Sequence, residues 1–100
     1  MALVIGTDRR INEVLNQGEQ SDLNKLEWLQ EQVGGYLECF SFHGPVKFGE
    51  KTYHAMMLNE DGKLKRLPVN EIATEIALSG GLRNDVIVGN VVLFATGEID

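Results

Sequence analysis

The chain has 100 residues, of which 43% are hydrophobic and 24% charged, and its net charge at pH 7 is −6. This length fits one domain, residues 1–100, and the composition is that of a globular protein rather than a disordered segment. The 15 acidic and 9 basic residues make a surface that repels phosphate backbones at long range, so we expect no direct nucleic-acid binding.

The sequence also predicts a compartment. Its single cysteine, Cys39, excludes an internal disulfide and suits a reducing environment. No stretch approaches the ~18 apolar residues of a membrane span, and residues 1–8 lack the basic and apolar regions of a signal peptide. We therefore expect a cytoplasmic protein without membrane contact.

Hydrophobic periodicity, with glycine, proline and asparagine signals between the periodic stretches, predicts the secondary structure. In chain order we expect a strand at 2–6, a strand or short helix at 11–15, a helix at 21–33, strands at 36–42, 52–58 and 63–67, a helix at 71–78, a strand at 86–95 and a polar tail at 96–100. Because hairpins dominate the middle of the chain, we predict an α+β fold: a mixed, mainly antiparallel sheet of about five strands with two helices packed on it.

Both predicted helices carry start and stop signals. The first begins at the cap residue Ser21 and ends at Gly34–Gly35, and the second begins at Asn70 and ends at 79–81. The apolar residues of the first helix recur at helical spacing and form one face: Leu23, Leu26, Leu29 and Val33.

Three further segments give more specific expectations. Residues 43–50 are predicted to be a loop or a wide hairpin connection. Asn59–Gly62 is a strong turn signal, so residues 63–67 are predicted to pair back as a hairpin strand that Pro68 ends. Residues 86–95 are nearly all apolar, which is typical of a central strand buried on both faces, and Gly89–Asn90 indicates a bulge or a close backbone approach.

The sequence lacks the common motifs of catalysis. It has no glycine-rich phosphate loop, no Gly-x-Ser-x-Gly and no His-Glu-x-x-His. His43, His54 and Cys39 do not have the spacing of a metal site. We therefore predict a protein that is not an enzyme and that uses no metal and no cofactor.

The most distinctive stretch is Asn59–Asn70, Asn-Glu-Asp-Gly-Lys-Leu-Lys-Arg-Leu-Pro-Val-Asn. Three of the nine basic residues fall within four positions there: Lys63, Lys65 and Arg66. On a strand, Lys63 and Lys65 would share a face, and the amides that begin the following helix favour an anion. The segment is either a site for a phosphate or carboxylate, or a solvated hairpin whose lysines protect an edge strand and are neutralised by nearby carboxylates.

Two other places are candidates for contact. Trp28 falls among polar residues, outside the apolar arc of its helix, so it predicts a contact with a partner or a second subunit unless residues 43–50 cover it. Glu38 shares a strand face with Tyr36, Phe40 and Phe42. If that face is core, Glu38 needs a buried partner; if it is solvated, the aromatic rings form an exposed platform, and either way the row is a candidate pocket wall.

The order of short motifs carries a family resemblance. Val33-Gly-Gly-Tyr-Leu-Glu38, the Asn59–Asn70 segment, Ala73-Thr74 and Ile87-Val-Gly-Asn-Val91 follow one another along the chain. This order resembles a family of small domains of unknown function that phages, plasmids and other mobile elements encode. Asn90 and Arg9-Arg10 depart from the family pattern, which more often has aspartate and a glycine-containing turn there. The resemblance implies a role in the cytoplasm of a bacterial host and implies no known activity.

We therefore expect a small phage- or plasmid-type protein that acts by non-catalytic binding or sequestration of a host protein or a small anionic ligand, a role that suits counter-defence. Two alternatives stay open: an oligomeric structural or assembly module, such as a homodimer through Trp28 or a sheet edge, and an acidic DNA mimic that inhibits a DNA-binding enzyme. The residues expected to bind a ligand or partner are Trp28, Tyr36, Glu38, Asn59, Glu60, Lys63, Lys65, Arg66 and Asn70.

Overall fold

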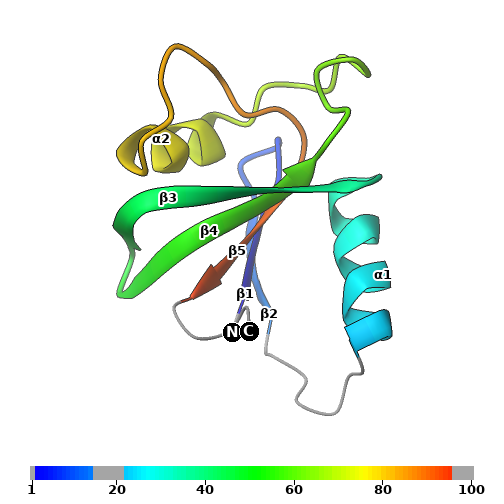
Figure 1. Ribbon diagram of the computed structural model, residues 1–100, viewed down its shortest axis with the longest axis horizontal. Helices are drawn as coiled ribbons and strands as arrows, with labels where there is room; N and C mark the ends of the chain where they lie inside the picture. The colour runs from blue at the N-terminus through cyan, green and yellow to red at the C-terminus, as the bar shows by residue number, and fades with distance from the viewer. Residues whose placement is uncertain (1, 15–21, 96–100) are drawn as a thin grey trace.

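A computed structural model describes residues 2–14 and 22–95. In these residues the elements are β1 (Ala2–Ile5), β2 (Ile11–Val14), α1 (Asp22–Val33), β3 (Leu37–Phe48), β4 (Lys51–Asn59), α2 (Glu71–Ser79) and β5 (Val91–Ala95). The strands form one sheet of order β2-β1-β5-β4-β3 (Figure 1), and each neighbouring pair is antiparallel. The predicted α+β fold is confirmed, with the described strands antiparallel throughout rather than mixed.

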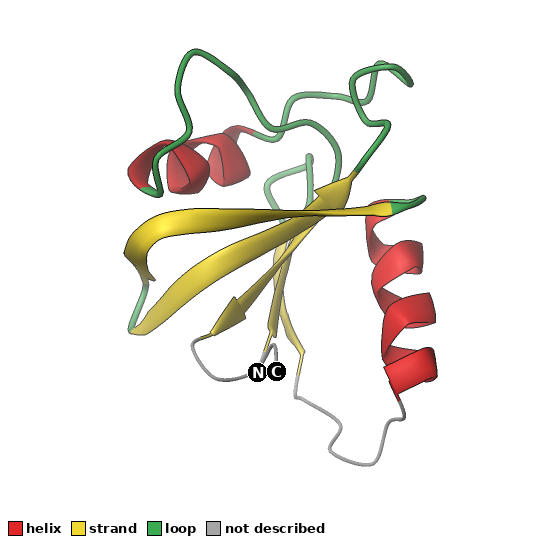
Figure 2. Ribbon diagram, viewed as in Figure 1, coloured by secondary structure: helices red, strands yellow, loops and turns green. Residues whose placement is uncertain are grey.

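The two helices cover opposite faces of the sheet, as Figure 2 shows by colour. Alternate residues of β5 divide between two apolar clusters: Val91 and Leu93 pack on the α2 side, and Val92 and Phe94 pack on the α1 side. All four side chains are buried. β5 is therefore the central strand that its apolar run predicts, because it supplies core residues to both faces.

The ends of the helices follow their capping chemistry. α1 ends at Val33, after which Gly34 adopts a left-handed φ of 80° and its N–H donates to the Gln30 carbonyl. Leu29 and Val33 are buried, as predicted for the apolar face. The expected cap Ser21 and the side chains of Leu23 and Leu26 lie outside what the structure describes. α2 begins at Glu71, directly after its cap Asn70.

The first hairpin settles the choice left open at 11–15. Ile11–Val14 is a strand, and it pairs with β1 in a register that sets Ile11 opposite Ile5. Arg9 lies in the turn between the strands and takes a left-handed φ of 71°. The tight turn leaves no room for a helix at this position, because the strand begins two residues after Arg9.

The predicted connection at 43–50 does join a hairpin, but its predicted extent is wrong. β3 continues to Phe48, with a register shift between Ser41 and Val46, and Gly49 and Glu50 make the turn to β4. Gly44 and Pro45 suggested a loop because both residues weaken strands. Pro45 is tolerated here because β3 is an outer strand and the proline sits inside the irregular segment, where no ladder hydrogen bond is lost.

The predicted hairpin strand at 63–67 is also wrong. Residues 60–66 form consecutive turns, closed by hydrogen bonds from Lys65 N–H to the Asp61 carbonyl and from Leu67 N–H to the Gly62 carbonyl. β4 already pairs with β3 on one edge and β5 on the other, so it has no edge to offer a hairpin partner. Lys63 and Lys65 therefore do not share a strand face.

The apolar run at 86–95 contains two kinds of structure. Only its second part, Val91–Ala95, is strand; in the first part Ile87 and Val88 are buried in a loop, and Val88 forms an isolated bridge with Val69. Gly89 separates the two parts with a φ of 78°, and a Cβ at this glycine would lie 2.8 Å from Leu67 Cδ1. It is thus the Leu67 side chain, rather than a second backbone segment, that lies close to Gly89.

Candidate functional site

A groove opens on the α2 side of the sheet, between the adjoining ends of β3 and β4 and the loop that follows α2. Its volume is about 190 Å³. Four of the nine candidate residues line it: Glu38, Asn59, Glu60 and Lys63. The remaining lining residues are Phe40, Leu58, Leu82, Asp85, Val86, Ile87 and Val88. We refer to this site as the acidic groove.

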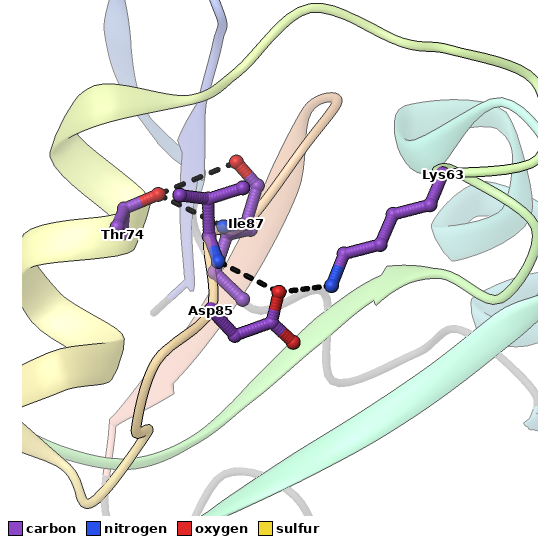
Figure 3. Close-up of polar contacts among 5 residues, drawn as sticks. Lys63, Thr74, Asp85 and Ile87 are labelled. Carbon is purple, nitrogen blue, oxygen red and sulfur yellow. Dashed lines mark hydrogen bonds and ion pairs between the residues drawn. The ribbon is translucent and has the colours of Figure 1, made fainter.

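Acidic side chains outnumber basic ones in the lining of the acidic groove. Lys63 Nζ forms an ion pair with Asp85 Oδ1 (Figure 3). The hydrogen bond from Lys63, followed by one from the Val86 amide, holds the pKa of Asp85 below its ordinary value. Because the one ammonium group of the lining is thereby neutralised, the carboxylates of Glu38 and Glu60 remain as exposed charges at the rim.

The wall of the acidic groove is fixed by hydrogen bonds. Thr74 on α2 accepts from the Ile87 N–H at 2.9 Å, and Asp85 Oδ1 accepts from the Val86 N–H at 2.8 Å. Figure 3 shows how these bonds and the Lys63 ion pair tie residues 85–87 between α2 and the turn after β4. The loop wall is therefore anchored on both sides.

The floor of the acidic groove is hydrocarbon. Phe40 points from β3 to the α2 side, where it meets Phe42 in an edge-to-face contact with ring centroids 5.6 Å apart. Leu58 of β4 and Ile87 of the loop pack against the same cluster. The groove thus joins an apolar floor to a carboxylate rim.

Two candidate asparagines are engaged in holding the fold. Asn70 is fully buried: its Nδ2 donates to the Ile5 and Gly89 carbonyls, both at 2.9 Å, and its Oδ1 accepts from the Ala73 N–H. Asn59 is 3% exposed, donates to the Val33 carbonyl at 3.1 Å and accepts from the Asp61 N–H at 2.8 Å. Both amide groups are used by the backbone, so the structure gives both residues a scaffold role.

The predicted anion site is not assembled. Lys65 and Arg66 are exposed and do not line the groove, and Lys65 Nζ instead lies near Gly35. The start of α2 faces Arg9, which forms an ion pair with Glu71. Lys63 pairs with Asp85, so the three basic residues and the helix start do not meet at one point.

Trp28 and Tyr36 lie apart from the acidic groove. Trp28 is half-buried and packs on the apolar cluster of the α1 side, so it does not stand clear of the core. The residues of that cluster include none from the 43–50 segment. Tyr36 is 68% exposed. Along β3, Leu37 packs toward α1 and Phe40 toward α2, so each face is partly covered and Glu38 lies exposed at the groove rim.

Sequence reasoning missed the loop that completes the groove. Asp85 lies between the predicted helix at 71–78 and the predicted strand at 86–95, and nothing local links it to Lys63, which is 22 positions away. Within the described residues, no cluster of three or more His, Cys, Asp or Glu side chains is placed to hold a metal ion. None of the helices in residues 2–14 and 22–95 has the length and apolar character needed to cross a membrane.

Comparison with known proteins gives one match. Residues 3–100 match the family model described as Domain of unknown function (DUF3846). No curated protein and no solved structure matches the chain significantly. The resemblance to a family of domains of unknown function is confirmed, and the chain belongs to the family DUF3846.

Proposed function

We propose that this protein is a non-catalytic binding domain that recognises a partner protein through the acidic groove. The observation that supports this proposal is the pairing of an apolar floor with a rim of exposed carboxylates, Glu38 and Glu60, beside a lysine already neutralised by Asp85. A lysine or arginine side chain can lay its hydrocarbon stem on such a floor while its charged end reaches the rim.

The dimensions and charge of the groove favour a protein partner over a small anionic ligand. A volume of about 190 Å³ is smaller than the ~300–1,000 Å³ of typical small-molecule sites. An anion would also meet the uncompensated carboxylates of Glu38 and Glu60. A groove of this size suits one anchoring side chain of a larger partner, which is how interface hot spots are commonly built.

The form of binding that we propose is sequestration of a host protein in the bacterial cytoplasm. This role follows from the mobile-element origin that the family resemblance implies, and it would serve counter-defence without chemistry. The lining side chains supply hydrocarbon, carboxylates and one paired ammonium, which are sufficient for recognition.

The test is affinity purification from the bacterial host with matched charge variants. We expect the wild type and a control double variant, Glu27→Lys with Glu31→Lys on exposed positions of α1, to retain the same partner. Glu38→Lys with Glu60→Lys should lose it, because the same charge change now falls on the groove rim. Titration of the purified partner should show an affinity that falls as salt rises.

Each other outcome points to a different function. Equal retention of the partner by both double variants would contradict recognition through the groove. Recovery of a second copy of the chain, measured by native mass spectrometry, would favour the assembly module. A DNA-binding enzyme whose binding is weakened by both double variants alike would favour the DNA mimic, since a mimic uses carboxylates spread over its surface.

A further inference from the structure

The outer edge of β3 differs between its two halves. In the second half the ladder is irregular between Ser41 and Val46, Pro45 has no N–H, and the His43 N–H donates to the Gly80 carbonyl at 2.8 Å. Bulges, prolines and covered amides are the devices that block the addition of another strand to a sheet edge. The second half of this edge is therefore closed.

The first half of the β3 edge has none of these devices. Leu37–Ser41 pairs with β4 in an unbroken register, from Leu37 opposite Asn59 to Ser41 opposite Ala55. The Glu60 N–H donates to the Tyr36 carbonyl at 2.9 Å, which shows that the backbone groups of Tyr36 point toward β4. Because hydrogen-bonded pairs alternate along antiparallel strands, the backbone groups of Leu37, Cys39 and Ser41 point away from β4. No described strand lies beyond this edge.

The open half of the edge adjoins the acidic groove. Side chains alternate along β3, so Glu38 and Phe40 point to the α2 side and line the groove, whereas Cys39 and Ser41 are exposed on the other face. A strand laid against Leu37–Ser41 would place alternate side chains directly beside Glu38. The free backbone groups of this edge and the Glu38 carboxylate are therefore close enough to bind the same segment of a partner.

We propose that the partner binds as an extended segment that adds a strand to β3 along Leu37–Ser41 and directs a lysine or arginine to Glu38 and Glu60. Main-chain hydrogen bonds would supply affinity, and the groove would supply specificity, as in other cases of strand addition. This inference rests on the proposed function, because the same groove receives the basic side chain.

Charge argues for a basic segment rather than a second copy of the chain. Each copy carries a net charge of −6. Antiparallel pairing of two β3 edges would also bring the Glu38 carboxylates of both copies close together on one face, where like charges repel. A basic segment relieves this repulsion instead of doubling it.

The experiment uses the wild-type protein and a synthetic peptide of seven residues, acetylated and amidated, in which lysine alternates with valine. Nuclear magnetic resonance would follow hydrogen exchange of the backbone amides. We expect the peptide to slow exchange at Leu37, Cys39 and Ser41 by at least about tenfold and to change Glu38 and Phe40 little, because their amides already bond to β4. A peptide with glutamate in place of lysine should give no protection.

Two further arms separate the inference from the proposed function. The same lysine peptide, N-methylated at every amide, keeps its charges but cannot donate main-chain hydrogen bonds; equally tight binding of this peptide would overturn strand addition and leave recognition by the groove intact. Absence of protection by the unmethylated peptide, or protection that depends on protein concentration alone, would also overturn the inference. Cys39→Pro should weaken binding of the lysine peptide by at least about tenfold. If this variant does not fold, the exchange measurement on the wild type still decides.

Discussion

Lys63 and Asp85 form an ion pair that joins the turn after β4 to the loop between α2 and β5. The pair lies in the lining of the acidic groove, and Asp85 neutralises the Lys63 ammonium group that was predicted to bind an anion. Both side chains are partly exposed, at 58% and 42%, so solvent screens their attraction. The pair acts mainly by fixing the groove wall and its net charge.

Replacing Lys63 should change the titration of Asp85. In Lys63→Met we expect the pKa of Asp85 to rise toward its ordinary value of 3.8, because the largest cause of its depression is the hydrogen bond from Lys63. A carboxyl whose pKa is lowered by folding adds stability above its unfolded pKa, and this stability is lost as pH falls through the folded pKa. The wild type should therefore be more stable than Lys63→Met at neutral pH and lose that advantage in acid. Carboxyl chemical shifts measured against pH test the first point, and urea unfolding at several pH values tests the second.

The matched control for this prediction is Lys65→Met. Lys65 is exposed and lies outside the groove lining, so its loss should leave the pKa of Asp85 unchanged. Identical Asp85 titrations in the two variants would show that the ion pair does not persist in solution.

Truncation of the Asn70 side chain should cause a large loss of folding stability. Asn70→Ala removes the cap of α2 and leaves the buried Ile5 and Gly89 carbonyls without their donor, which we expect to lower the free energy of unfolding by about 2–4 kcal/mol. Asn70→Ser keeps a capping oxygen and should recover about 1 kcal/mol of that loss. Urea denaturation measures both, with Asn12→Ala on an exposed strand position as a control that should change little. Equal losses for Ala and Ser would mean that the cap contributes nothing.

Two glycines offer a steric test of the groove floor. A Cβ at Gly80 would lie 2.5 Å from Phe42 Cδ1, whereas at Gly44 it would meet nothing within 4 Å. Gly80→Ala should therefore lower the free energy of unfolding by about 1–3 kcal/mol, while Gly44→Ala should stay within about 0.5 kcal/mol of the wild type. Because Phe42 packs on Phe40, Gly80→Ala should also weaken binding at the groove. Similar melting temperatures for the two variants would show that Phe42 moves aside without cost.

Features that depend on neighbours in sequence could be predicted. The cap at Asn70 reaches an amide three residues on, and the left-handed Gly34 closes its helix onto Gln30, so short segments carry the necessary signals. The central position of β5 could also be predicted, because a strand buried on both faces must be apolar at consecutive positions.

Features that depend on distant partners could not be predicted. The 63–67 segment reads as a hairpin strand until both edges of β4 are known to be occupied. Pro45 reads as a loop residue unless β3 is known to be an outer strand. The candidate site was the hardest feature to predict. Lys63 could be chosen from the sequence and does line the groove, but its partner Asp85 comes from a distant loop. Thr74 and the Val69–Val88 bridge set the position of that loop.

The position of β5 determines when the chain can fold. β5 pairs with β1 on one side and with β4 on the other, so it joins the hairpin at the beginning of the sequence to the β3–β4 hairpin. During synthesis both hairpins emerge before β5 and each keeps an unpaired edge until residues 91–95 leave the ribosome. Ala2 must then meet Phe94, a closure that spans nearly the whole sequence and makes folding slower than in a protein of local contacts. The sheet is therefore completed only after β5 has been made, because β5 is the strand that joins the two hairpins.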